Sequence, residues 1–137
     1  EHDHPYRPPR RTPRPRIVGV MHGRIDAPAH STAAPIDEHG RYKVLLPFDL
    51  NGQPGGQASR WIRVAQPSSG PGYGVHVPMH LGAEVAIAHL GGDPDRPVIV
   101  GAVHNADTPN PVSRENSTQS WLKTQAGIRV LFDDDVQ

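Results

Sequence analysis

Between residues 17 and 103, apolar and polar residues alternate in short runs with the two-residue period of β-strands. No stretch keeps a helical period beyond one turn. We predict five strands, at residues 17–25, 41–48, 61–65, 84–90 and 98–103. Glycines at positions 19 and 23 predict bends in the first strand, as a small barrel needs. In the second strand, the alternation predicts an inward face of Tyr42, Val44, Leu46 and Phe48.

Five short strands without helices predict an all-β fold, and a five-stranded OB-fold barrel fits the count. An SH3-like barrel has the same periodicity and stays open at this point. The segment between the last two strands has the composition of a tight turn. Glycines permit positive φ, prolines fix φ and lack an N–H, and aspartates can bond to their own backbone. We therefore predict a structural turn formed by Gly91, Gly92, Asp93, Pro94, Asp95 and Pro97.

The segments on either side of the predicted barrel differ from it in composition. Residues 1–16 hold five prolines and five arginines, which predicts an extended linker. Residues 104–116 form a second polar linker that contains prolines. Residues 117–137 return to strand character, with apolar side chains alternating after Gly127. A lone hairpin is marginal in water, so this segment needs the barrel, another copy of the chain or further residues as a partner.

Composition and motifs limit the chemistry. The 137 residues carry 14 Lys+Arg and 14 Asp+Glu, so no net charge attracts nucleic acid or a membrane surface. There is no cysteine, and the nine histidines lack the spacing of metal ligands. The run Asp37-Glu38-His39 fits loop polarity as well as an acid–base group. Residues 68–70 do not form a nucleophile elbow. We predict no enzymatic activity, no cofactor and no metal site.

Aromatic residues offer one binding alternative. Trp61, Tyr42, Phe48 and Tyr73 could stack on bases, as in nucleic-acid-binding OB barrels. Stacking of this kind works beside a basic groove, and the balanced charge predicts none. Packing in the core is therefore the preferred interpretation of these side chains.

Several motifs occur in a fixed order along the chain: RWIRVAQP (60–67), GYGVHVP (72–78), GAEV (82–85), GGDPDRPVIVG (91–101), VHN (103–105) and GIRVLFDD (127–134). Together they resemble the VgrG family, the central spike proteins of type VI secretion, which are related to the hub–spike proteins of contractile phage tails. The resemblance implies an OB-fold barrel at residues 17–103 and a linker at 104–116. It also implies that residues 117–137 begin a triple-stranded β-helix needle. A hub would precede the linker at 1–16, and most of the needle would follow the sequence.

The resemblance also implies a function. A homotrimeric spike would cap a tube of ring proteins, contact baseplate subunits and carry a tip protein or effectors on its needle. It would be assembled in the bacterial cytoplasm and driven through the target-cell membrane when a sheath contracts, without binding nucleic acid. We expect the trimer interface to include Trp121, Leu122, Ile128, Val130 and Phe132. An oligonucleotide-binding OB module and a tail-associated cell-wall hydrolase fragment remain as alternatives.

Overall fold

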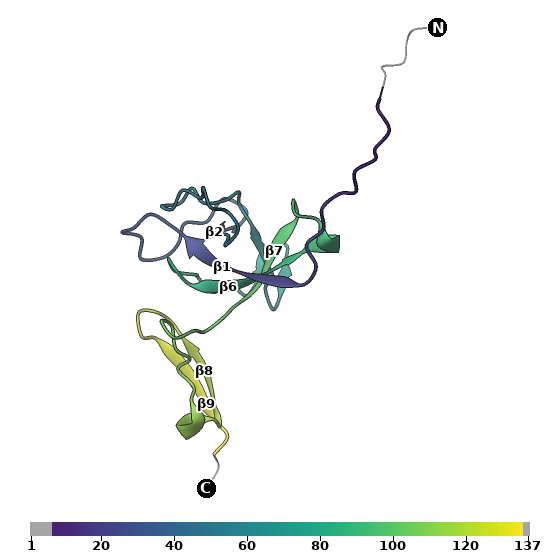
Figure 1. Ribbon diagram of the computed structural model, residues 1–137. Coiled ribbons are helices and arrows are strands. Elements are labelled where there is room, and N and C mark those ends of the chain that lie inside the picture. Colours follow the sequence, from purple (N-terminus) through teal and green to yellow (C-terminus); the bar gives the residue numbers. More distant parts are fainter. Residues whose placement is uncertain (1–6, 136–137) are drawn as a thin grey trace. The chain divides into compact units, whose positions relative to one another are not determined.

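The computed structural model describes residues 7–135, whose regular elements are strands apart from two single 3-10 turns. The chain divides into two compact units between Ala102 and Val103, and Figure 1 shows the elements of each. The predicted all-β class is confirmed.

The first unit is built around one five-stranded sheet. Its strands are β1 (Val20–Asp26), β2 (Lys43–Leu45), β3 (Arg63–Val64), β6 (Glu84–His89) and β7 (Pro97–Ala102). Their order in the sheet is β2-β1-β6-β7-β3, and only β3 and β7 pair in parallel. These strands lie within or beside the five predicted segments; β7 is as long as predicted, and the other four are shorter.

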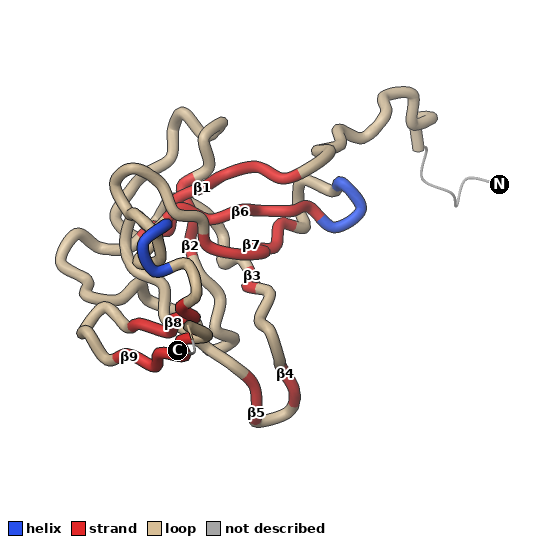
Figure 2. Tube along the Cα trace, turned by 90° about the horizontal axis from the view of Figure 1, so that it is seen from below, coloured by secondary structure: helices blue, strands red, loops and turns tan. Residues whose placement is uncertain are grey.

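The two edge strands of this sheet approach each other. Tyr42 and Ile62 form an antiparallel bridge, in which the Tyr42 amide donates to the Ile62 carbonyl (2.9 Å) and the Ile62 amide to the Tyr42 carbonyl (2.7 Å). Tyr42 precedes β2 and Ile62 precedes β3, so the bridge joins the ends of the sheet into a curled barrel. Figure 2 shows this curvature from below. The architecture is that of the predicted OB fold.

The core lies inside the curl and consists mainly of β-branched side chains. Those with the least exposure are Tyr42, Ile25, Ile87, Ile99, Val44 and Val85. They come from β1, β2, β6, β7 and the residue before β2, as the period of two requires. Burying each of them contributes on the order of 1.5–3 kcal/mol.

Gly23 has a different role from the predicted bend. The register of β1 against β6 runs without interruption through Gly23. A Cβ at this position would lie 2.6 Å from Val44 Cγ1 and 2.8 Å from Ile87 Cδ1. The absence of a side chain therefore lets the core pack against the β1 backbone. The irregularity in the sheet occurs instead in β6, where the register shifts between Ala86 and Ile87.

The predicted inward position of Phe48 is wrong. β2 ends at Leu45, and the Asp49 amide then donates to the Leu46 carbonyl (3.1 Å) to form a turn. Pro47 lies inside this turn and cannot donate to a sheet ladder. Phe48 is consequently 59% exposed.

The sequence also failed to predict a small hairpin in the glycine- and proline-rich stretch after β3. β4 (Ser69–Gly70) and β5 (Tyr73–Gly74) pair there, with Gly72 at a φ of 80° in the turn. A Cβ on Gly70 would collide with the Tyr73 ring, so that glycine makes room for the aromatic side chain. Figure 2 shows the hairpin projecting from the barrel.

The second unit contains a 3-10 turn (Arg114–Asn116) and a hairpin of β8 (Gln119–Lys123) and β9 (Arg129–Asp133). Its turn has a positive φ of 89° at Gly127. The Thr124 amide donates to the Ile128 carbonyl (2.8 Å), which closes the turn.

Candidate assembly surfaces

The predicted turn residues lie in the connection from β6 to β7 and at the first position of β7. Gly91 and Gly92 have φ values of 64° and 74°, which favour glycine. The Asp93 side chain accepts from the Asp95 amide (3.0 Å), and the Arg96 amide donates to the Asp93 carbonyl (3.0 Å). Pro97 is the first residue of β7. These contacts hold the connection in one conformation.

The same turn also contacts the segment that enters β1. The Ile17 amide donates to the Gly92 carbonyl (2.9 Å). A Cβ on Gly92 would lie 3.2 Å from the Ile17 carbonyl oxygen and 3.7 Å from Arg16 Cβ. Gly92 therefore serves both the turn and the close approach of residues 16–17. The sequence pattern indicated only the first of these two roles.

Asp26, at the end of β1, anchors a loop that the sequence analysis did not single out. Asp26 is 5% exposed, and its carboxylate accepts from the amides of Gly55 (2.8 Å), Gly56 (2.7 Å) and Ala58 (3.0 Å). Burial raises the pKa of Asp26, but the backbone hydrogen bonds outweigh burial and hold the pKa below its ordinary value. The anchor fixes the loop before β3 to the barrel.

The β8–β9 hairpin divides the five predicted interface residues between its faces. Leu122 is opposite Val130 and Ser120 is opposite Phe132, whereas Trp121 is opposite Leu131. Because side chains alternate across a strand, Trp121 lies on the other face from Leu122, Val130 and Phe132. Alternation also places Ile128 with Val130. We call this group of Leu122, Ile128, Val130 and Phe132 the apolar hairpin face.

Neighbouring residues partly enclose Trp121, whereas the apolar hairpin face is bare. The Lys123 ammonium lies 5.9 Å and the Arg129 guanidinium 5.5 Å from the indole centroid. Trp121 Nε1 also donates to Gln119 Oε1 (3.0 Å). By contrast, Phe132 is 66% exposed and Ile128 is 70% exposed. An interface built on the apolar hairpin face would thus leave the cation–aromatic cluster around Trp121 on the opposite face.

The β4–β5 hairpin and its return path, residues 66–78, form an uncharged arm of the first unit. Tyr73, Val75 and Val77 are exposed along it. Where the arm rejoins the barrel, His76 stacks on Tyr42 with a centroid distance of 6.4 Å. The preferred core-packing interpretation of the aromatic residues therefore holds for Tyr42, which is buried, and is wrong for Tyr73 and Phe48.

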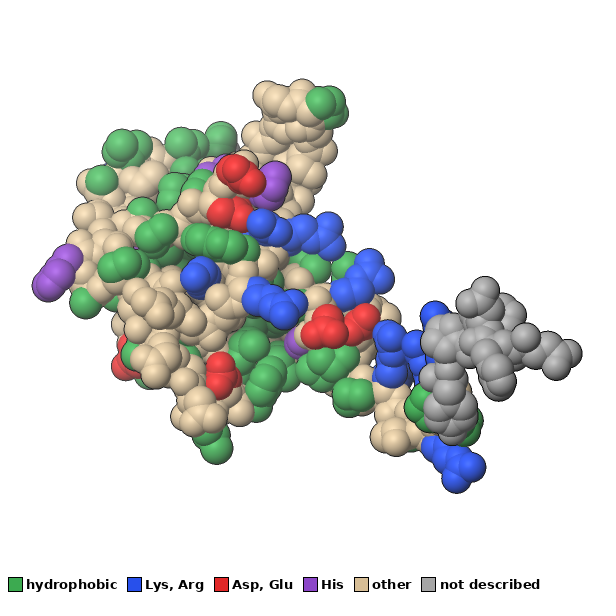
Figure 3. All heavy atoms as spheres, turned by 90° about the horizontal axis from the view of Figure 1, so that it is seen from above, with side chains coloured by type: hydrophobic (Ala, Val, Ile, Leu, Met, Phe, Trp, Pro, Cys, Tyr) green, Lys and Arg blue, Asp and Glu red, His purple; other side chains and the backbone are tan. Residues whose placement is uncertain are grey.

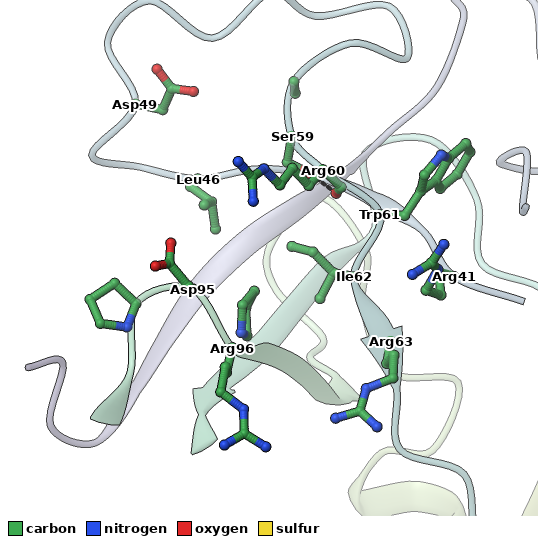
Figure 4. A pocket seen from close by; sticks show the side chains of 13 residues that line it. Arg41, Leu46, Asp49, Ser59, Arg60, Trp61, Ile62, Arg63, Asp95 and Arg96 are labelled. Atoms are coloured by element: carbon green, nitrogen blue, oxygen red, sulfur yellow. Dashed lines mark hydrogen bonds between the residues drawn. The ribbon is translucent and has the colours of Figure 1, made fainter. Parts of the chain in front are cut away.

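A second surface of the barrel is lined by arginines. A cavity of about 390 Å³ lies over the Tyr42–Ile62 bridge. Its lining includes Arg41, Arg60, Arg63 and Arg96 together with Trp61, and Figure 4 shows these side chains from close by. We call this cavity the arginine pocket. Trp61 is half-buried there, and the Lys43 ammonium lies 5.1 Å from its ring.

The candidate acid–base run at Asp37 is occupied by local contacts. The Asp37 carboxylate accepts from the amides of His39 (3.0 Å) and Arg41 (2.9 Å) and pairs with the Arg41 guanidinium. Desolvation raises the pKa of Asp37, but the hydrogen bond from the Arg41 side chain and the other contacts lower it to about 2. This carboxylate is ionised near neutral pH and is suited to holding Arg41 in place.

Within residues 7–135, no group of three or more His, Cys, Asp or Glu side chains could hold a metal ion. His2 and His4, which the sequence placed in the N-terminal linker, lie outside the described residues. No helix in the described part of the chain has the length and apolarity to cross a membrane.

Comparison with known protein families identifies the family to which the barrel belongs. Residues 32–104 match the family described as the type VI secretion system/phage-baseplate injector OB domain. The chain belongs to this family. The matched residues hold β2, β3, β6 and β7, which decides between the OB and SH3-like alternatives.

Relatives of this injector OB domain carry the VgrG name. The type VI secretion system spike protein VgrG5 of Pseudomonas aeruginosa is 35% identical over 122 residues, covering 88% of this chain and 15% of the relative. VgrG1a of the same organism is 40% identical over 91 residues, covering 66% and 14%. The actin cross-linking toxin VgrG1 of Vibrio cholerae is 35% identical over 114 residues, covering 82% and 10%. The predicted membership of the VgrG family is confirmed.

The chain spans 10 to 15% of the length of these three VgrG relatives. Two of these relatives are named as spike proteins, and the third is named as an actin cross-linking toxin.

Proposed function

We propose that this chain is a structural segment of the puncturing spike of a contractile injection machine, and that it does not catalyse a reaction. The observation that carries the proposal is an injector OB barrel followed, after a linker, by a hairpin with an exposed apolar face. Sequence similarity to proteins that are named as type VI secretion spikes supports the same role. A spike must be rigid, and a curled sheet whose edges are bridged supplies rigidity.

The second part of the proposal is that three copies of the chain assemble through the hairpin. The apolar hairpin face holds four large side chains that nothing covers within residues 103–135. Burying each contributes on the order of 1.5–3 kcal/mol, and three-fold symmetry repeats the gain in every copy. Because a two-stranded hairpin is marginal alone, folding of this unit and assembly would be coupled.

In this proposal the hairpin starts a triple-stranded needle, and residues 1–16 link the barrel to a hub. The assembled spike would cap the tube of ring proteins, contact the baseplate and carry a tip protein or effectors into the target cell. The spike names of the relatives and the baseplate-injector description of the matched family support the spike and baseplate parts of this proposal.

The assembly is tested by multi-angle light scattering on the chain and on the double variant Ile128→Asp/Val130→Asp. We expect the unmodified chain to have about three times the 14.9 kDa mass of one copy. We expect the variant to be monomeric, because charged side chains oppose burial of the apolar hairpin face.

Leu131→Asp is the matched control, since Leu131 lies opposite Trp121 on the other face of the hairpin. The control should remain trimeric. A monomeric unmodified chain, or a trimer that survives both substitutions on the apolar hairpin face, would contradict the assembly.

A further inference from the structure

The arginine pocket brings cations together from three separate segments. Arg41 and Arg63 flank the Tyr42–Ile62 bridge on opposite strands. Arg96 comes just before β7, which pairs in parallel with β3 so that Arg63 is in register with Val98. Figure 4 shows the side chains of Arg63 and Arg96 extending in the same direction, with Arg41 beside Arg63. The curl of the sheet thus concentrates positive charge on the outside of the barrel, beside the Tyr42–Ile62 bridge.

Among the described residues, only one of these guanidinium groups forms an ion pair. Arg41 pairs with Asp37, with its Nη2 atom 2.6 Å and its Nε atom 2.7 Å from the same carboxylate oxygen. Arg60, Arg63 and Arg96 form no ion pair within residues 7–135. A bound anion would supply the counter-charge that Arg63 and Arg96 lack among the described residues.

The donors in the pocket are suited to carboxylates. A guanidinium offers parallel N–H donors that match the two oxygens of a carboxylate. Trp61 also lines the pocket, and in Figure 4 its indole extends away from the guanidinium groups of Arg63 and Arg96. The donors that an acidic side chain would contact are therefore those of the arginines.

Two acidic residues interrupt the basic surface. Asp49 and Asp95 line the same pocket. On the face of the molecule seen in Figure 3, acidic side chains also lie among the basic ones. A nucleic-acid backbone needs a continuous positive track, which this surface does not offer. Isolated carboxylates avoid repulsion from Asp49 and Asp95 because they contact the arginines alone.

We propose that the arginine pocket binds carboxylate side chains in an acidic segment of a partner protein. The proposal goes beyond the spike role and does not depend on trimer formation, because the lining residues all belong to the first unit.

The test uses the whole chain and two fluorescent probes, a labelled tetraglutamate peptide and a labelled oligothymidylate, in buffer with about 20 mM salt. Fluorescence anisotropy should show the peptide binding with a Kd below roughly 1 mM. Arg63→Gln/Arg96→Gln should weaken that binding by about tenfold or more, since two charge-assisted contacts are lost. Arg63→Lys/Arg96→Lys should give an intermediate loss, because the charge remains and the forked geometry does not.

The matched control is Arg24→Gln/Arg114→Gln, which removes the same charge from exposed arginines outside the pocket. The control should retain the affinity of the unmodified chain, and circular dichroism should show all variants folded. Absence of peptide binding at this salt concentration would overturn the proposal, as would an equal loss in the control. Oligothymidylate binding as tightly as the peptide and depending on Arg63 and Arg96 would also overturn it, by assigning the pocket to phosphate.

Discussion

The barrel and the hairpin use the same alternation of residues with opposite results. In the barrel, the apolar face of each strand meets the faces of other strands, and Val44, Val85 and Ile87 are fully buried. In the β8–β9 hairpin, the alternation is as regular, yet both faces remain largely exposed. The difference is the number of strands available: five strands can enclose a core, and two cannot. Burial therefore depends on what a strand pairs with as well as on its sequence.

The largest expected effect on stability comes from replacing an isoleucine with alanine, and each of the two regions offers one isoleucine for the comparison. Ile87→Ala should lower the free energy of unfolding of the barrel by about 2–5 kcal/mol, because it leaves a cavity in the core. Ile128→Ala should change the stability of the barrel by less than about 0.5 kcal/mol, because Ile87 is 0% exposed in the barrel core whereas Ile128 belongs to the second unit. Urea unfolding followed by circular dichroism measures both. Similar losses in the two variants would erase the distinction between the regions.

A smaller effect is expected where the barrel backbone approaches its own core. Gly23→Ala should cost about 1–3 kcal/mol, because the added Cβ overlaps Val44 and Ile87. Gly101→Ala in β7 is the matched control, because no atom lies within 4 Å of the position that its Cβ would take. Thermal unfolding should show a lowered Tm for the first variant only. A tolerated Gly23→Ala would mean that the barrel core is as adaptable as the hairpin.

Asp26 adds a pH dependence that is specific to the barrel. Its pKa is lower in the folded state than the ordinary value of 3.8, so its stabilising contribution is present above that value and is lost as pH falls through the folded-state pKa. Asp26→Asn should cost about 1–2 kcal/mol at pH 7 and flatten the fall in stability below about pH 4. Urea unfolding at several pH values measures this slope.

The control for Asp26 is Asp134→Asn, an exposed aspartate in the hairpin unit. It should leave the stability of the barrel at pH 7 unchanged. If the two variants behave alike, the hydrogen bonds to the loop amides are not what stabilises this part of the barrel.

The smallest expected effect concerns a polar atom in the barrel core. Within residues 7–135, His89 Nδ1 is the buried side-chain atom that has no hydrogen-bond partner. His89→Leu should therefore raise the free energy of unfolding by roughly 0.5–1 kcal/mol, because an unsatisfied group is removed. Differential scanning calorimetry can detect the change. A loss of stability instead would show that the imidazole ring contributes packing that leucine cannot replace.

Local sequence was a good guide wherever backbone chemistry is self-contained. In the β6–β7 turn, Gly91 and Gly92 have positive φ values, and the Asp93 side chain accepts a hydrogen bond from the Asp95 amide two residues later. The period of two likewise located the sheet strands to within a few residues. The order of family motifs identified the OB fold, which periodicity alone could not separate from a similar barrel.

Contacts between distant residues were beyond the reach of the sequence. Phe48 continues the alternation of β2, but the chain turns away at Pro47 and exposes it. Asp26 bonds to amides about thirty positions away, and no local pattern marks those amides as its donors. The arginine pocket also depends on the curl of the sheet, because Arg41, Arg63 and Arg96 are far apart along the chain.

By itself, the sequence determined the two-residue period, the β6–β7 turn and the family, since these depend on neighbouring residues and on motif order. The tertiary structure decided which alternating faces are buried, and it placed Trp121 on the opposite face of the hairpin from Leu122 and Val130. It also brought the arginines together beside the Tyr42–Ile62 bridge. The physical reason is that burial and the distance between charges depend on which strands pair. Pairing joins segments that are distant in the sequence, so it cannot be inferred from one segment alone.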